Sequence, residues 1–237
     1  MPSEPTPARP PDEVQDGPVK PDPGASGPRL TAVGVSKTIG PITLLAPTSV
    51  DVAPGTAVVL RGPNGAGKTT LLKILAGTLE PTTGTATLDG RTVDERDPAT
   101  RANVAALIGV PTAYRDLTLA DHLTLVDATW GRDPDTCDER VDEGLAALGI
   151  GHLHDRFPHE LSSGQGQLFR LALTLFRPAT LLILDEPEQR LDTDKRGVVA
   201  QLLVDRKRAG TTVVIACHDP AMTATVADEV LDVDHDE

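Results

Sequence analysis

The pattern of hydrophobic positions divides the chain near residue 29. Residues 1–28 are dense in Pro, Gly, Ser and acidic side chains and hold almost nothing that could be buried, so we expect a disordered tail. From Leu30 onward, short apolar runs are separated by turn residues such as Gly40-Pro41 and Asp89-Gly90, which is typical of antiparallel strands. The strands predicted in this front part cover 30–33, 42–45, 49–52 and 84–88.

Helical and buried patterns alternate over the last third of the chain. Helices are expected at 165–176 and 193–208, and buried strands at 181–184 and 212–216, before a short helix and a last strand that ends near Val233. Because helices that alternate with fully apolar strands are typical of a parallel sheet, this part predicts an α/β core.

The middle of the chain is predicted to be mainly helical. Thr118 and Asp121 have the spacing of a capping box, and Asp133-Pro134 is a favourable start for a second helix. We therefore expect one α/β domain over 29–237, with a helical subdomain over about 104–165 inserted between the two halves of a ligand site.

The segment 62–70 carries the most specific chemical signal, because it fits the pattern G-x-x-x-x-G-K-[ST] between a buried strand at 57–60 and a helix. Glycines let backbone N–H groups approach a polyphosphate, and the helix N-terminus adds partial positive charge. Lys68 would reach the β- and γ-phosphates, and the Thr69 hydroxyl would hold Mg²⁺. The expected phosphate-binding residues are Gly62, Asn64, Gly65, Gly67, Lys68, Thr69 and Thr70.

Two further motifs point to the same chemistry. The apolar run 181–184 delivers Asp185 and Glu186 at the carboxyl end of a strand, where open α/β sheets bind ligands. We expect Asp185 to hold Mg²⁺ and Glu186 to orient and deprotonate a water that attacks the γ-phosphate. Residues 161–165, LSSGQ, lead a helix and make a second anion site, which one nucleotide in one chain does not need.

Taken together, these motifs make the chain similar to the ATP-binding subunits of ABC transporters, over about 30–233. LSSGQ is close to the LSGGQ signature of that family, and Cys217-His218-Asp219 follows the last central strand. The resemblance implies an ABC-type P-loop NTPase fold, with a mixed sheet that has an antiparallel β part and an inserted helical subdomain. In this fold two subunits trap two ATP molecules head to tail. It makes Lys68, Glu186 and His218 the catalytic residues and assigns nucleotide contacts to Ser162, Gly164, Gln165 and Asp192.

The sequence departs from the family at three places. Gly109 stands at the glutamine position of the Q-loop, so metal sensing there is expected to be weak or backbone-mediated. Ile39 stands where an aromatic ring usually stacks on adenine, which predicts weaker base discrimination. Glu188-Gln189-Arg190 replaces small residues and is expected to change the dimer seam.

Composition narrows the partners and the location. A formal net charge of −13 argues against nucleic acid as the main partner. The N-terminal residues do not resemble a signal peptide, no stretch is long and apolar enough to span a membrane, and Cys137 and Cys217 favour a reducing, intracellular site. We therefore expect a cytoplasmic protein at the inner face of the cell membrane.

The function predicted from the sequence is an ATPase, with ATP and Mg²⁺, that powers a transporter whose membrane-spanning permease is a separate chain. The contact with that permease is expected at 109–123, and a faint likeness to exporter-type subunits around 106–123 favours efflux. The dimer partner is a second copy or a different ABC ATPase. Two alternatives remain: a soluble ABC ATPase of the iron–sulfur assembly type, and a P-loop kinase for a small molecule.

Overall fold

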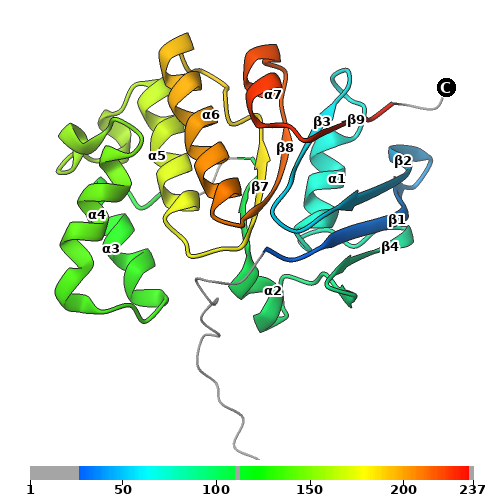
Figure 1. Cartoon of the computed structure of the whole chain (residues 1–237), viewed down its shortest axis with the longest axis horizontal. Helices are drawn as coiled ribbons and strands as arrows, with labels where there is room; N and C mark the ends of the chain where they lie inside the picture. The colour runs from blue at the N-terminus through cyan, green and yellow to red at the C-terminus, as the bar shows by residue number, and fades with distance from the viewer. Residues whose placement is uncertain (1–26, 110–112, 235–237) are drawn as a thin grey trace, which may run out of the picture.

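The computed structural model describes residues 27–109 and 113–234, which contain two β-sheets, one near the middle of the molecule and one at its right-hand side in Figure 1. The first sheet is antiparallel, in the order β2-β1-β4-β5. Its strands are β1 (Leu30–Ile39), β2 (Ile42–Val52), β4 (Thr83–Leu88) and β5 (Arg91–Thr92). The second sheet is parallel, in the order β6-β7-β8-β3-β9. Its strands are β3 (Ala57–Arg61), β6 (Val104–Leu107), β7 (Leu181–Asp185), β8 (Thr212–Ala216) and β9 (Glu229–Asp232).

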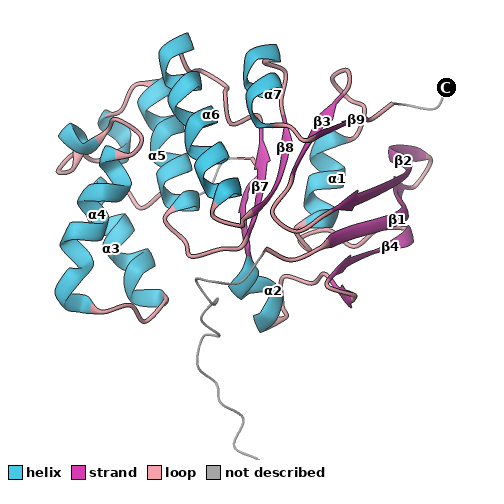
Figure 2. Ribbon diagram, viewed as in Figure 1, coloured by secondary structure: helices cyan, strands magenta, loops and turns pink. Residues whose placement is uncertain are grey.

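Helices cover the parallel sheet. Two of them, α3 (Leu119–Thr129) and α4 (Cys137–Ala146), form a helical part at one side of the molecule (Figure 2). The chain order is α1 (Lys68–Leu75), α2 (Pro98–Asn103), α3 (Leu119–Thr129), α4 (Cys137–Ala146), α5 (Ser163–Leu175), α6 (Thr193–Arg208) and α7 (Pro220–Val226). Short 3-10 turns lie at Pro134–Thr136, Gly151–Leu153 and Pro158–Glu160. Within the described ranges, no helix is long and apolar enough to cross a membrane.

The parallel sheet separates two hydrophobic cores. Leu182 and Leu184 of β7 face the core formed with α3 to α7, whereas Leu181 and Ile183 face α1 and the antiparallel sheet. Strands β3 and β8 alternate in the same way, so each is apolar at nearly every position. Burial on both faces explains why these strands have continuous rather than alternating apolar patterns.

The register of the parallel sheet aligns the ends of its central strands. Leu60 at the end of β3 and Asp185 at the end of β7 both pair with Ala216, the last residue of the intervening strand β8. The segments that follow these three strands therefore leave the sheet at one edge. This alignment brings the glycine-rich loop, the Asp185-Glu186 pair and His218 to the same place.

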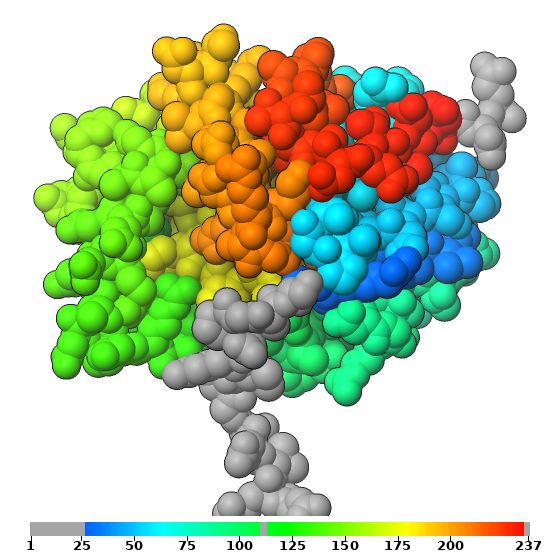
Figure 3. All heavy atoms as spheres, viewed as in Figure 1, coloured from blue at the N-terminus to red at the C-terminus, as the bar shows by residue number. Residues whose placement is uncertain are grey.

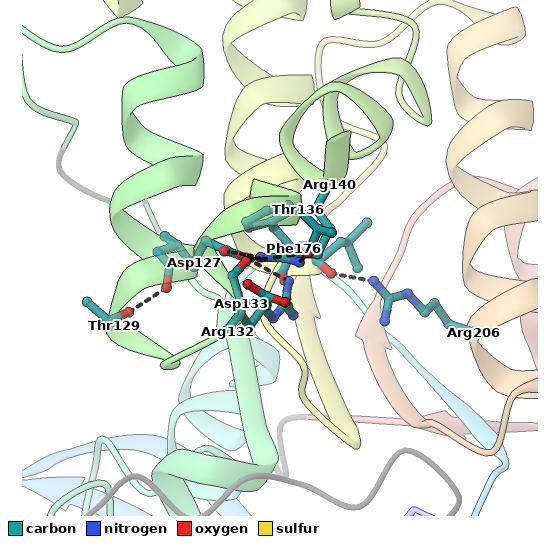
Figure 4. Close-up of polar contacts among 10 residues, drawn as sticks. Asp127, Thr129, Arg132, Asp133, Thr136, Arg140, Phe176 and Arg206 are labelled. Atoms are coloured by element: carbon teal, nitrogen blue, oxygen red, sulfur yellow. Dashed lines mark hydrogen bonds and ion pairs between the residues drawn. The ribbon is translucent and has the colours of Figure 1, made fainter. Parts of the chain in front are cut away.

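A buried carboxylate links the helical part to the rest of the domain (Figure 4). Asp127 of α3 is 2% exposed and accepts hydrogen bonds from Arg132 and Arg140. Arg132 also donates to the carbonyl oxygen of Phe176 after α5 at 3.0 Å, and its guanidinium lies over the Phe176 ring. Arg206 of α6 donates to the carbonyl oxygen of Leu175. In the space-filling view, the green helical part packs directly against the yellow and orange helices α5 and α6 (Figure 3).

The structure confirms the predicted α/β architecture and refines its boundaries. The antiparallel strands form a sheet of their own rather than sharing one sheet with β3. Strand β6 pairs with β7, so the first residues of the segment 104–165 belong to the parallel sheet, and the helices begin after them.

The tail boundary also lies earlier than expected. The predicted disorder of 1–26 lies outside the described residues, but the last two residues assigned to the tail are docked on the core. The Gly27 N–H donates to Gly210 at 2.7 Å, and the carbonyl oxygen of Pro28 accepts from Thr212 at 2.9 Å. The sequence did not predict this contact, because it is made by the backbone and not by large apolar side chains.

Candidate nucleotide-binding site

The glycine-rich loop at residues 62–67, the phosphate loop, connects β3 to α1 and wraps around the Lys68 ammonium group. Lys68 is only 7% exposed, and its Nζ donates to the carbonyl oxygens of Gly62 at 2.8 Å and Pro63 at 2.9 Å. Gly62 has φ +147°, and a Cβ there would lie 2.1 Å from the carbonyl oxygen of Val233. The loop can therefore take this path only with glycine at 62, and it holds one buried cation beside the N-terminus of α1.

Thr69 and Asp185 form the second part of the site. The Thr69 hydroxyl donates to Oδ2 of Asp185 at 2.7 Å, which joins the first turn of α1 to the end of β7. Burial raises the pKa of the Asp185 carboxyl, and the neighbouring charge of Glu186 raises it further. A hydroxyl and a partly buried carboxylate are oxygen ligands that suit Mg²⁺, and a cation would relieve the cost of the buried charge.

Glu186 lies between two side chains that contact its two carboxylate oxygens. Nε2 of His218 is 3.3 Å from Oε1, and Nε2 of Gln189 donates to Oε2 at 2.8 Å. Glu186 has φ +47°, an uncommon conformation for a residue with a side chain. Its backbone N–H donates to Ala216 at the end of β8, at 2.9 Å. The arrangement places a carboxylate beside an imidazole, and either group can act as a general base toward a nearby water.

The signature turn, residues 161–165 at the start of α5, approaches the segment that follows Glu186. Ser162 caps this helix in a reciprocal capping box with Gln165. A Cβ at Gly164 would lie 2.9 Å from the carbonyl oxygen of Arg190, so glycine allows close packing. Among the described residues, no hydrogen bond or ion pair joins Ser162, Gly164 or Gln165 to residues 62–70. The chain thus brings the phosphate loop together with Asp185, Glu186 and His218, but not with its own signature turn.

The sequence profile described as ABC transporter matches residues 45–189 of this chain. The chain belongs to the ABC transporter family. It is 34% identical over 203 residues to the Fe(3+) ions import ATP-binding protein FbpC of Brucella abortus (strain 2308), a match that covers 85% of this chain and 57% of that protein. The FbpC protein of Mesorhizobium japonicum is 36% identical over 209 residues, covering 85% of this chain and 56% of that protein. The chain therefore spans little more than half the length of these curated relatives.

Solved ABC structures share the fold. An ATP binding subunit of an ABC transporter superposes with a TM-score of 0.78 at 24% identity, over 86% of this chain and 85% of that one. A dimeric ATP-binding cassette in a post-hydrolysis state, bound to ADP and Pi, gives a TM-score of 0.78 at 21% identity, over 86% of this chain and 94% of that one. These comparisons establish the ABC ATPase fold that the resemblance implied.

Asp192, the ABC D-loop aspartate by resemblance, has a local structural role. It caps α6 by accepting the backbone N–H of Lys195 at 2.9 Å, and it pairs with the Lys195 ammonium at 2.9 Å. The hydrogen bond from that N–H and then the ammonium lower the pKa of the Asp192 carboxyl.

The two unusual ABC positions have clear surroundings. Ile39 ends β1 and is 59% exposed opposite Ile42, which is 61% exposed. The hairpin of β1 and β2 passes the phosphate loop, because a Cβ at Gly67 would lie 2.7 Å from the carbonyl oxygen of Leu44. Gly109 has φ +74°, a conformation that glycine adopts more readily than glutamine. Most of the expected permease-contact segment 109–123 is described, but residues 110–112 lie outside the described ranges.

Sequence reasoning missed the roles of Glu188 and Gln189. Both were noted only as departures from the ABC pattern, yet Gln189 contacts Glu186, and Oε1 of Glu188 accepts the backbone N–H of His218 at 2.7 Å. The available signal was a run of polar residues soon after Asp185-Glu186. It could not show which side chain turns inward.

Proposed function

We propose that this chain is the ATP-binding and ATP-hydrolysing subunit of a membrane importer whose membrane spans lie on a separate permease chain. The observation that carries the proposal is the meeting of Lys68, the Thr69–Asp185 pair and the Glu186–His218 pair at one edge of the parallel sheet. Membership of the ABC transporter family supports it. The protein would work at the inner face of the cell membrane, in the cytoplasm.

In this proposal, each group has one task in hydrolysis. The loop 62–70 and Lys68 bind the phosphates of ATP, and Thr69 and Asp185 would hold Mg²⁺, which supplies charge neutralisation at the β- and γ-phosphates. Glu186 accepts a proton from the water that attacks the γ-phosphorus, and ADP and phosphate leave as products. His218, 3.3 Å from Glu186, orients that carboxylate and contacts the γ-phosphate.

The direction of transport in this proposal is import. The relatives at 34–36% identity are named for Fe(3+) import, which replaces the efflux direction expected from the sequence. The permease chain would select the cargo.

The active form in this proposal is a head-to-tail dimer. The exposed serines of the signature turn lie at the start of α5 without a hydrogen bond to residues 62–70 of the same chain. A second subunit that supplies this turn would complete each ATP site. The solved cassette of this fold that is bound to ADP and Pi is a dimer, which supports this arrangement. The γ-phosphate then favours the closed dimer, because it contacts both subunits.

Glu186→Gln tests the proposal. Removal of the proton acceptor should lower ATP turnover by about 10²–10⁴-fold, while MgATP binding persists. The variant should also accumulate as a dimer in saturating MgATP, measured by light scattering after size-exclusion chromatography. Glu139→Gln on the exposed side of α4 is the matched control and should behave as the wild type.

Two outcomes would overturn the proposal. Equal turnover before and after Glu186→Gln would remove Glu186 as the base. A variant that stays monomeric with MgATP, alone and with any related ATPase from the same cell, would remove the shared site. Co-purification with a multi-span membrane protein tests the transport role, and its absence would favour the soluble ABC ATPase.

A further inference from the structure

We propose that Glu188 is a positioning residue that holds the His218 segment in register with Glu186. This inference rests on the proposed function, because it assigns a task to Glu188 in the same hydrolysis site. Glu188 touches neither Mg²⁺ ligands nor the phosphate loop through any hydrogen bond in the described chain. Its carboxylate accepts the backbone N–H of His218 at 2.7 Å and lies close to the Cys217 thiol.

The burial of Glu188 is costly and therefore informative. The residue is 6% exposed, and Oε2 is buried without a hydrogen-bond partner among the described residues. No ion pair within the described ranges involves this side chain. A buried carboxylate with one unsatisfied oxygen destabilises a fold unless another gain offsets it. The visible gain is the short bond to His218.

The bond connects two segments that must stay aligned for catalysis. Glu188 follows β7 by three residues, and His218 follows β8 by two. The backbone between Glu186 and Leu191 is a tight turn, in which the Gln189 N–H donates to Glu186 at 3.1 Å and the Leu191 N–H donates to Glu188 at 3.2 Å. This turn directs Gln189 outward to the Glu186 carboxylate and Glu188 inward to His218.

The Cys217 thiol lies beside the Glu188 carboxylate. Burial and the negative charge of Glu188 raise the pKa of this thiol to about 12, so it stays protonated. The neighbouring Asp219 carboxylate is paired with Arg196 at 2.9 Å. The group from which Glu188 accepts at a normal hydrogen-bond distance is the backbone N–H of His218.

The consequence concerns the distance between His218 and Glu186. With the bond in place, the imidazole lies 3.3 Å from Oε1 of Glu186. Without it, the chain after β8 loses its tie to the turn after β7, and the imidazole samples positions away from the carboxylate. Small misplacements of a catalytic group reduce turnover much more than they reduce substrate binding by a separate loop.

The test uses the full-length protein with substitutions at Glu188 and His218. Glu188→Met fills the same volume without an acceptor, and Glu188→Gln keeps an oxygen acceptor without the charge. We expect Met to lower kcat about tenfold with little change in KM for ATP, and Gln to keep most of the turnover. In a His218→Ala background, Glu188→Met should cause no further loss, because Glu188 acts through His218.

The outcomes separate this inference from the proposed function. An inactive wild type would end the proposed function, whereas an active wild type with an equally active Glu188→Met variant would end only the role of Glu188. A loss that adds fully to His218→Ala would show a purely structural role and also end it. Hydrogen exchange offers a second measurement: the His218 amide should exchange slowly in the wild type and the Gln variant, which both offer an oxygen acceptor, and faster in Glu188→Met or Glu188→Ala, which offer none. Equal exchange in the wild type and the Ala variant would contradict the bond even if Met does not fold.

Discussion

At the scale of single residues, the site keeps groups that the fold would be more stable without. Asp185 is partly buried at the end of β7, and burial raises its pKa, so its negative charge opposes folding. The hydrogen bond from Thr69 offsets only part of this cost. Functional sites often lower the stability of the fold in this way, because a charged ligand group is kept although it destabilises the ligand-free protein.

Asp185→Asn should therefore raise the melting temperature of the nucleotide-free protein in EDTA and abolish MgATP hydrolysis. Asparagine keeps an oxygen that can accept from Thr69 but carries no charge. Calorimetry and phosphate release measure the two effects. Asp192→Asn is the comparison: the pKa of Asp192 is lowered by its contacts with Lys195, so this change should not stabilise the protein. A lower melting temperature for Asp185→Asn would contradict the prediction.

At the scale of elements, side-chain caps fix where helices begin, and one ion cluster joins the helical part to α5. Thr118, Ser162 and Asp219 each cap a helix with a side-chain hydrogen bond to the backbone, so α3, α5 and α7 begin where local chemistry directs. The Asp127 cluster joins the end of α3 to the start of α4 and, through Arg132, to the end of α5. Elements that each bury one face are thereby fixed in one arrangement.

Asp127→Asn should lower the free energy of unfolding by about 3 kcal/mol, because two arginines lose a buried partner. We take the low end for buried pairs, since both arginine side chains are about a quarter exposed. Asp94→Asn, which breaks an exposed pair with Arg96, is the control and should cost much less, because solvent screens the pair. Urea unfolding measures both, and equal costs would contradict the prediction.

The stabilisation that Asp127 provides should depend on pH. Burial alone would raise the pKa of Asp127, but hydrogen bonds from Arg140 and Cys137 and the arginine charges lower it overall. A lowered pKa stabilises the fold above the unfolded value of about 3.9 and loses that effect as the pH falls through the folded pKa. The difference in unfolding free energy between wild type and variant should therefore be full at neutral pH and shrink below about pH 4. A constant difference would contradict this assignment.

At the scale of the whole molecule, each ATP site of the proposed dimer would combine the phosphate loop, Asp185 and Glu186 of one subunit with the signature turn of the other. The phosphate loop meets Asp185 and Glu186 within one chain, whereas Ser162 contacts Gln165 and faces outward. A closed dimer with two-fold symmetry makes two equal composite sites from these parts. Mixed dimers can test that arrangement.

Lys68→Ala and Ser162→Asp should each be inactive alone and partly active when mixed. Alanine removes the phosphate-binding ammonium, and aspartate keeps the helix cap but repels the γ-phosphate with its charge. A mixed dimer regains one site with a native Lys68 and a native Ser162. Coupled-enzyme assays on each variant alone and on the mixture measure the recovery. No recovery in a sample that contains mixed dimers would contradict the head-to-tail arrangement.

Much of this architecture was predictable from local sequence. The helix 193–208 and the strand 212–216 lie where they were predicted, because Asp192 caps the start of the helix, Gly210 follows its end, and the strand is a continuous apolar run. The helix α2 was missed although Asp97-Pro98 offers the same kind of start signal as Asp133-Pro134. Its six residues are too short to show a period of their own.

By itself, the sequence determined the phosphate loop, the acidic pair after an apolar strand and the helix caps, because each depends on neighbours only a few residues away. Tertiary structure alone decided which of these meet. The pairing of Leu60 and Asp185 with Ala216 aligns the ends of three strands. The inward turn of Glu188 lets its carboxylate accept the backbone N–H of His218. Strand register and the burial of one side chain are set by the packing of distant segments, and no local pattern encodes them.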